Sequence, residues 1–208
     1  MAATLLKIHP KNPESRKINT VVDCIRDGGV VIYPTDTVYG IGCDIHQARA
    51  VERISKIKGL DPRKYLFSFI CHDLSHIAEY ASVEDQVFKI MKKALPGAFT
   101  FILKASNKVP KVLNNNRKTV GIRIPEHNIP RMIVAELGNP FLSTSLKEED
   151  NAIEYSTDPE LIYERYQHEV DLVVDGGIGG YLPSTIVDCS QGEIVVVRSG
   201  LGDFTPFL

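Results

Sequence analysis

The apolar positions of this chain switch repeatedly between helical spacing and the continuous runs of buried strands. Residues 14–27 carry an apolar side chain at every third or fourth position, and the helix that this predicts stops at Gly28. The next apolar run, residues 30–33, is β-branched or aromatic and is closed by Pro34, which is typical of a buried strand. The polar, glycine-containing stretch 35–42 then predicts a turn.

The same alternation continues toward the C-terminus. Further helices are predicted at residues 47–58, 74–80, 82–95, 129–137 and 159–166. A capping box of Ser82 and Asp85 is predicted to open the third of them. Further strands are predicted at residues 66–71, 100–104, 120–124, 141–146, 172–174, 185–187 and 194–197. Some neighbouring strands have connections too short for a crossover helix, so we expect one α/β domain over 1–208, core motifs over 14–200, with a mixed sheet.

Composition places the chain among ordinary globular proteins. Of its 208 residues, 43% are hydrophobic and 24% are charged, which excludes disordered and fibrous classes. No apolar run approaches the roughly 18 residues that a membrane span needs, and the N-terminal segment lacks a secretory pattern. We therefore expect a cytoplasmic protein without a membrane partner.

Neither the cysteines nor the glycines form a common cofactor motif. The cysteines Cys24, Cys43, Cys71 and Cys189 lack metal-ligand spacing, so no metal site is predicted. Three of them lie in or beside apolar runs and are interpreted as structural. Cys43 lies beside the glycine turn and could be exposed there, with a nucleophilic role as an outside alternative. No Walker A or dinucleotide-binding fingerprint is present, and the glycines of 175–180 predict a flexible or tightly turned loop.

Cations gather in two stretches although the formal net charge is −2, which argues against a chain that coats nucleic acid through its overall field. The first stretch holds Lys56, Lys58, Arg63 and Lys64, and the second holds Lys104, Lys108, Lys111, Arg117 and Lys118. Each stretch taken alone is most simply a solvated face. Their position beside polar turns favours a binding surface.

Three polar groups are candidates for ligand binding. The turn after residues 30–33 offers several oxygens that suit anionic or hydroxyl-bearing ligands, beginning with Thr35. Arg123 stands between two apolar strand residues and so points to the face opposite theirs, where a surface arginine is the plain interpretation. Ser143 and Ser145 share one face of a strand end. For single hydroxyls, ordinary hydrogen bonding within the fold is an equally good interpretation.

Six motifs occur in order along nearly the whole chain: YPTDTVYGIG, PGAFTFIL, TVGIRIP, STS, PSTIVD and VVVRSG. Together they resemble the YrdC/YciO family, whose best-known members are L-threonylcarbamoyladenylate synthases. The resemblance implies a single-domain, twisted mixed sheet with flanking helices and a basic concave cavity. It also implies a reaction in which threonine, bicarbonate and ATP, accompanied by Mg²⁺, give threonylcarbamoyl-AMP and pyrophosphate for tRNA modification.

The resemblance carries specific roles onto this chain. The residues that it implies for threonine are Thr35, Arg123, Ser143 and Ser184. The residues that it implies for ATP are Lys58, Arg63, Lys64, Thr119, Ser145 and Arg198. Among these, Lys58 and Arg198 would neutralise phosphate charge during catalysis. No paired carboxylates or Ser, His, Asp set is visible, which fits a reaction run by positioning and electrostatics.

The chain also departs from the synthase pattern. Leu60, Lys64 and Phe69 stand where synthases have an arginine, an asparagine and a histidine, and these substitutions resemble the YciO branch. Two alternatives therefore stay open beside the synthase. One is a protein that binds double-stranded RNA or tRNA with weak or no catalysis, and the other acts on threonylcarbamoyl groups already attached to RNA.

Overall fold

A computed structural model describes residues 2–61, 64–113, 116–146 and 154–207. Within these residues, eleven strands form one sheet in the order β1-β9-β2-β3-β8-β4-β7-β6-β10-β11, and β5 pairs with β6 beside this path. The strands are β1 (Thr4–Lys7), β2 (Val31–Tyr33), β3 (Gly40–Asp44), β4 (Ser68–Ile70), β5 (Ala81–Ser82), β6 (Phe99–Ala105), β7 (Thr119–Arg123), β8 (Phe141–Ser145), β9 (Leu172–Asp175), β10 (Thr185–Asp188) and β11 (Val195–Arg198).

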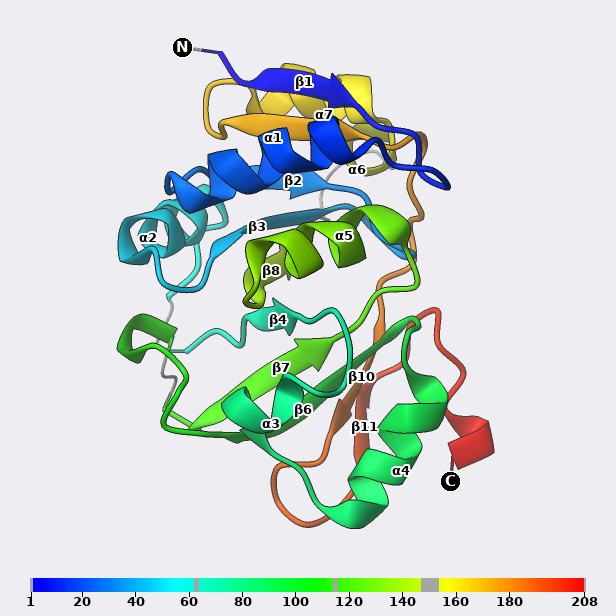
Figure 1. The fold of residues 1–208 in the computed structure, drawn as a ribbon. Helices are drawn as coiled ribbons and strands as arrows, with labels where there is room; N and C mark the ends of the chain where they lie inside the picture. The colour runs from blue at the N-terminus through cyan, green and yellow to red at the C-terminus, as the bar shows by residue number, and fades with distance from the viewer. Residues whose placement is uncertain (1, 62–63, 114–115, 147–153, 208) are drawn as a thin grey trace.

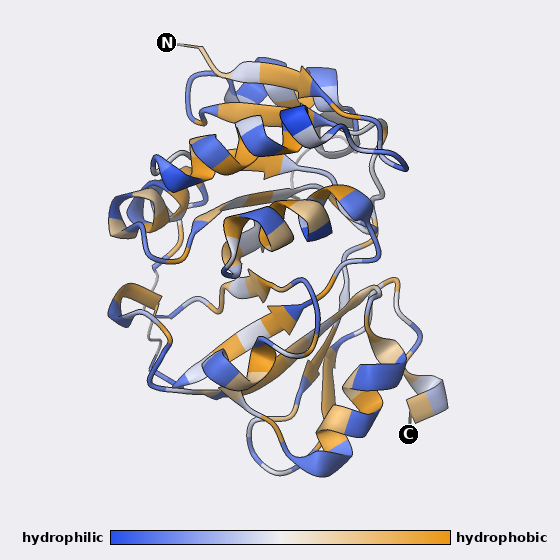
Figure 2. Cartoon of the chain, viewed as in Figure 1, coloured by the Kyte–Doolittle hydropathy of each residue, from blue (hydrophilic) through white to orange (hydrophobic). Residues whose placement is uncertain are grey.

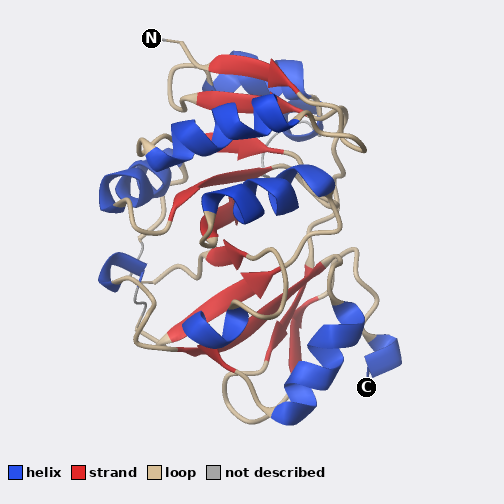
Figure 3. Cartoon of the chain, viewed as in Figure 1, coloured by secondary structure: helices blue, strands red, loops and turns tan. Residues whose placement is uncertain are grey.

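Helices flank this sheet along its whole length (Figure 3). They are α1 (Ser15–Arg26), α2 (Ala48–Ile57), α3 (Ile77–Tyr80), α4 (Asp85–Ala94), α5 (Asn128–Leu137), α6 (Glu154–Thr157) and α7 (Pro159–Tyr166), with short 3₁₀ turns at Lys111–Leu113 and Thr205–Phe207. In Figure 1, α1 and α5 lie in front of the half that holds β2, β3 and β8, whereas α3 and α4 lie beside the half that holds β6 and β7. None of the helices in the described segments is long and apolar enough to cross a membrane.

The sheet mixes both strand directions, which confirms the expected α/β architecture. Parallel pairing joins β1 to β9, β2 to β9, β4 to β7 and β6 to β10. Antiparallel pairing joins β2 to β3, β3 to β8, β4 to β8, β6 to β7 and β10 to β11. The parallel pairs bring the ends of distant segments to shared edges of the sheet, and such edges are where α/β folds place ligands.

Helical periodicity correctly predicted the helices that cover the sheet. In α1 the buried residues are Ile18, Val21, Val22 and Ile25, which is one face of the helix. They pack against Tyr33 and Phe141 of the sheet, whose rings meet edge to face at 4.9 Å. Figure 2 shows the apolar stripes of the helices and the largely apolar strands.

The predicted capping box is wrong. Helix α4 begins after Glu84, and the side chain of Glu84 makes no capping hydrogen bond. Ser82 belongs instead to β5, where it pairs with Lys104. Ser82 pairs through its backbone with β6, so it cannot also serve as the first residue of the helix, as the sequence pattern predicted.

Strand β3 was predicted as part of a turn, and this prediction is wrong from Gly40 onward. All five residues of β3 are buried, and the strand pairs with both β2 and β8. A Cβ at Gly42 would lie 2.4 Å from the carbonyl oxygen of Leu142, so only glycine allows β8 to approach this closely. Gly40 and Gly42 have no side chains, so the strand does not show the alternation of side chains by which strands are predicted.

Candidate functional site

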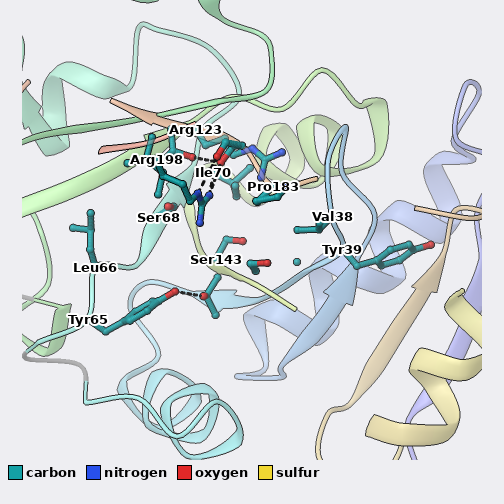
Figure 4. Close-up of a pocket in the computed structure, with 16 residues that line it drawn as sticks. Val38, Tyr39, Tyr65, Leu66, Ser68, Ile70, Arg123, Ser143, Pro183 and Arg198 are labelled. Atoms are coloured by element: carbon teal, nitrogen blue, oxygen red, sulfur yellow. Dashed lines mark hydrogen bonds between the residues drawn. The ribbon is translucent and has the colours of Figure 1, made fainter. Parts of the chain in front are cut away.

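A pocket with about 600 Å³ of empty space, part of it open to solvent, lies where strands from both halves of the sheet meet. Five residues that the sequence singled out line it: Arg123, Ser143, Ser145, Ser184 and Arg198. Figure 4 shows them together with lining residues that the sequence analysis did not single out, among them Tyr65 and Ser68. We call this site the arginine pocket.

Arg123 is held at the pocket by the turn that follows β2. Its Nη2 donates to Asp36 Oδ1 at 2.6 Å, to the hydroxyl of Thr37 at 2.6 Å and to that of Thr35 at 3.2 Å. Its neighbour Ile122 is fully buried on the opposite face of β7, as strand alternation predicted. The Nε of Arg123 is buried and has no hydrogen-bond acceptor in the described part of the protein. A buried guanidinium N–H without a partner is costly, so this group favours a bound acceptor.

Hydrogen bonds within the turn hold its shape. The Thr35 hydroxyl donates to the carbonyl of Val38 at 2.8 Å and accepts from the backbone N–H of Thr37 at 3.0 Å. Thr35 thus contacts Arg123 but is not among the residues that line the pocket. Its hydroxyl shapes the turn and orients the arginine.

The glycine-rich stretch 175–180 packs against the same turn. A Cβ at Gly179 would lie 2.6 Å from the ring of Tyr39, and a Cβ at Gly180 would lie 2.5 Å from the carbonyl oxygen of Thr37. The Tyr39 hydroxyl donates to the carbonyl of Gly177 at 2.7 Å, and its ring points away from the two arginines in Figure 4. Of the two predicted alternatives, this packing favours the tightly turned loop, and the loop contacts the turn at Thr37 and Tyr39.

Arg198 brings a second guanidinium into the pocket. It lies on β11, and its Nη2 donates to the carbonyl of Ser184 at 2.8 Å. Burial and the positive charge of Arg123 both lower the pKa of Arg198, while the hydroxyl of Tyr65 has the opposite effect. An arginine nevertheless remains protonated in a protein. Two neighbouring cations in a partly buried pocket repel each other, and an anionic ligand would offset that repulsion.

Hydroxyl groups complete the pocket. Ser184 Oγ lies 2.8 Å from Thr100 Oγ1, and the hydroxyl of Tyr65 lies 2.8 Å from Thr144 Oγ1. A further bond runs from the buried hydroxyl of Tyr33 to Ser143 Oγ. Sequence reasoning missed Tyr33, Tyr65, Thr100 and Thr144. The parallel register that sets Thr100 opposite Ile186, two residues from Ser184, is a tertiary relationship, and the sequence carries no signal for it.

A second hollow adjoins the arginine pocket and shares Leu66 with it. Two residues predicted for ATP, Lys64 and Thr119, line this hollow. Thr119 and Arg123 are four residues apart on β7 and so lie on one face of that strand. The residues implied for ATP and those implied for threonine thus meet along one surface of the sheet.

The remaining predicted cations lie differently. Lys58 follows α2, and its Nζ donates to the carbonyl of Leu146 at 3.2 Å. Leu146 is the residue after Ser145, the last residue of β8. Lys58 therefore reaches the end of β8 without being among the residues that line the pocket. Arg63 lies outside the described residues.

Two of the substituted positions face the core. Phe69 is buried against Tyr80, with the two ring centroids 5.6 Å apart, whereas its neighbour Ser68 lines the arginine pocket. Leu60 is half-buried and packs on the main apolar core. The side chain of Phe69, at the position where synthases have a histidine, therefore points away from the pocket.

Cys43 is fully buried, which corrects the idea that it could be exposed beside the turn. Burial is the main cause that raises the pKa of its thiol, and the nearby carboxylate of Asp44 adds to the effect. A thiol in this state is a poor nucleophile. Within the described residues, no three His, Cys, Asp or Glu side chains are placed to hold a metal ion.

The fold and the site together define an α/β protein with a mixed sheet and a pocket that two arginines and a row of hydroxyls line. Residues 23–200 match the Sua5/YciO/YrdC family model, which is described as "Telomere recombination". The chain belongs to this family.

Individual relatives agree with that membership. The YciO protein of Escherichia coli (strain K12) is 44% identical over 202 residues, covering 97% of each chain. The crystal structure of E. coli YciO superposes with a TM-score of 0.92 over 99% of this chain and 100% of that one. A threonylcarbamoyl-AMP synthase of Coxiella burnetii is 30% identical over 87% of this chain and 97% of its own. P. abyssi Sua5 complexed with L-threonine gives a TM-score of 0.85 at 25% identity, over 95% of this chain and 58% of that one.

Proposed function

We propose that this protein is a threonylcarbamoyl-AMP synthase that converts L-threonine, bicarbonate and ATP to threonylcarbamoyl-AMP and pyrophosphate, for the threonylcarbamoyladenosine modification of tRNA. The observation that carries the proposal is the convergence of Arg123 and Arg198, with the hydroxyls of Ser143 and Ser184, on one pocket. The synthase of Coxiella burnetii and the threonine complex of P. abyssi Sua5 support it by family relationship.

In this proposal the carboxylate of threonine binds beside Arg123. The Nε of that residue is buried without an acceptor in the described residues, and a carboxylate oxygen would supply one. Asp36 and the two threonines of the turn hold Nη2, so the guanidinium is oriented before the substrate arrives. The hydroxyls of Ser143 and Ser184 then contact the polar groups of threonine.

ATP extends from Arg198 into the adjoining hollow that Lys64 and Thr119 line. Arg198 would neutralise phosphate charge, and Lys58 would do so from the end of β8. Mg²⁺ would arrive bound to the phosphates of ATP. Asp36 is already paired with Arg123, and Asp188 of the adjoining hollow accepts from the backbone N–H of Ser190, so each of these two carboxylates already has a partner.

The chemistry needs alignment more than a protein nucleophile. The amino group of threonine combines with bicarbonate to give a carbamate and water. A carbamate oxygen then attacks the α-phosphorus of ATP, and the bond to pyrophosphate breaks. The positive charge of Arg198 would stabilise the charge that develops on the phosphate oxygens.

The test is pyrophosphate release by purified protein. We expect release only when threonine, bicarbonate and Mg-ATP are all present. Arg123→Lys keeps the charge but loses the planar fork, so kcat/KM for threonine should fall about 30-fold or more. The matched control is Arg16→Lys, at an exposed position of α1 far from the pocket, which should leave the rate unchanged. Absence of threonine-dependent release from the wild-type protein would refute the proposal.

A second candidate is a protein that binds double-stranded RNA or tRNA and has weak, altered or no synthase activity. The observation that favours it is that Phe69 and Leu60, which stand where synthases have a histidine and an arginine, are apolar and pack on the core. The exposed cations Lys104, Lys108, Lys111, Arg117 and Lys118 would provide the phosphate contacts.

Salt dependence separates these two candidates. RNA binding through phosphates weakens steeply with added salt, whereas threonine binding should not. The double variant Lys108→Ala/Lys111→Ala should weaken RNA binding and leave threonine binding intact, and Arg123→Ala should do the reverse. RNA binding that is insensitive to salt, or to the lysine changes, would count against this second function.

A further inference from the structure

A separate hollow lies at the carboxyl ends of β4 and β7, which are parallel neighbours. It has about 730 Å³ of empty space, part of it open to solvent. The residues that line it are His72, Asp73, Leu74, Ser75, Lys92, Leu95, Pro96, Ile124 and Arg131. None of these residues lines the arginine pocket. We call it the α4–α5 hollow, because Lys92 lies near the end of α4 and Arg131 near the start of α5 (Figure 1).

The position of this hollow is one that α/β folds use for ligands. Ligands bind outside the carboxyl ends of parallel strands, where loops leave the sheet. After β4 the chain continues into His72 and Asp73, and after β7 it continues into Ile124. The two exits are tied together, since the backbone N–H of Cys71 donates to the carbonyl of Arg123 at 2.9 Å. The loops therefore form a fixed floor.

The charges of the hollow are unbalanced toward the positive. Lys92 and Arg131 make no ion pair with any described residue, and the Nε of Arg131 is buried without a hydrogen-bond acceptor there. The carboxylate among the described lining residues, Asp73, accepts from Ser75 and lies 3.1 Å from the ring of His72. Those hydrogen bonds, chiefly that from the Ser75 hydroxyl, hold the pKa of Asp73 well below its usual range, so it is committed to its own loop. The Nε of Arg131 is therefore free to donate to an acceptor that enters the hollow.

The remaining wall is apolar. Leu95 and Ile124 are buried beneath the hollow at 7% and 2% exposure, and half-buried Leu74 lies at its side. Apolar side chains with a few convergent polar groups are the usual lining of small-molecule sites. The hollow thus pairs an anion-binding end with an apolar surface.

We propose that the α4–α5 hollow is a second ligand site, which binds a small organic anion with an apolar body. The anionic group lies between Lys92 and Arg131 and accepts from the buried Nε of Arg131. The apolar body lies on Leu74, Leu95 and Ile124. The shared chemistry of a carboxylate or a phosphate monoester suffices for the anionic end.

The experiment is a titration followed by the backbone amide signals in a ¹H–¹⁵N NMR spectrum, with sodium benzoate as the probe. Benzoate should shift the amides of residues 72–75 and 131 along one saturable curve. Benzamide has the same ring without the charge and should bind at least about tenfold more weakly, because it cannot form charge-assisted hydrogen bonds. Acetate lacks the ring and should also bind more weakly. Phenyl phosphate in place of benzoate distinguishes the two kinds of anionic group.

Variants assign the effect to the two cations. Lys92→Gln and Arg131→Gln should each weaken benzoate binding about tenfold. Lys93→Gln, the adjacent exposed position on α4 that does not line the hollow, should leave it unchanged. Lys92 is exposed, so its variant keeps the test valid even if Arg131→Gln fails to fold. Equal binding of benzamide and benzoate, shifts scattered over the surface without saturation, or unchanged binding by Lys92→Gln would overturn the proposal. The readout is benzoate binding and not pyrophosphate release, so the outcome does not depend on whether the proposed synthase function is right.

Discussion

Arg123 Nη2 and Asp36 Oδ1 lie 2.6 Å apart and join strand β7 to the turn after β2. Strands β3, β8 and β4 separate these two elements in the sheet, so the pair links segments that are not neighbours in it. The side chains are 10% and 12% exposed, and solvent screens them little. This ion pair orients the guanidinium. It should also contribute to the free energy of unfolding, so a substitution at the site should change stability.

Removing the arginine should therefore destabilise the protein. Arg123→Met leaves the Asp36 carboxylate buried without its partner, and we expect the free energy of unfolding to fall by about 3–5 kcal/mol. Adding Asp36→Asn to that variant should recover part of the loss, since an amide costs less to bury than a charge. Urea unfolding of the two single variants and the double variant measures the coupling. Strict additivity of the single effects would show that the pair is not energetically coupled.

Tyr65 offers a second test at the other side of the pocket. Tyr65→Phe removes the 2.8 Å hydrogen bond to Thr144 but keeps the edge-to-face contact with Phe67, whose ring centroid is 5.0 Å away. We expect a loss of about 1 kcal/mol in the free energy of unfolding. Tyr65→Leu should cost more, because the ring contact is lost as well. If the two variants unfold alike, the ring contact contributes nothing measurable.

Position 69 tests whether the family's histidine can be restored. Phe69 is 1% exposed, so Phe69→His buries a polar ring in the core, and we expect a destabilisation of about 2–4 kcal/mol without a gain in pyrophosphate release. Leu60→Arg should cost less, because a long side chain at this half-buried position can reach solvent. Thermal unfolding and the release assay measure both. A more active Phe69→His variant would mean that this strand can turn its other face to the pocket.

The parts of the fold that were predicted from the sequence depend on local periodicity. The apolar stripe of α1 and the orientation of Arg123 opposite to that of Ile122 each follow from spacing within one element. Strand β3 was missed because Gly40 and Gly42 carry no side chain that could display an alternation. Edge strand β1 was missed because its four residues are mostly exposed, and pairing with β9 rather than burial defines it.

In the candidate site, only residues that belong to sequence motifs were predicted. Ser143 and Arg198 were named from their motifs, and both line the pocket. The contact of Ser143 with Tyr33 depends on the registers of three adjacent strands, β2, β3 and β8, and no local pattern encodes such a register. The core-facing orientation of Phe69 could not be predicted, because spacing along a motif does not say which face of a short strand each residue takes.

His127 links stability to pH. It caps α5, where its Nδ1 accepts from the backbone N–H of Ile129 at 3.3 Å. Burial lowers the pKa of His127 below its usual value of about 6.5, and the nearby carboxylate of Asp36 opposes this shift only partly. The unfolded chain therefore takes up the proton first as the pH falls. Above about pH 6.5 the residue makes no difference, and from there down to the folded pKa the free energy of unfolding should decrease.

The comparison that isolates this effect is His127→Asn, which keeps a capping side chain but cannot be protonated in this range. Urea unfolding of both proteins at pH 7.5, 6.5 and 5.5 gives the pH slope of each. The wild-type protein should lose more stability than the variant between pH 6.5 and 5.5, because protonation of Nδ1 removes the acceptor for Ile129. Equal slopes would show that His127 is protonated as readily in the folded protein as in the unfolded chain, and a steeper slope for the variant would reverse the predicted sign.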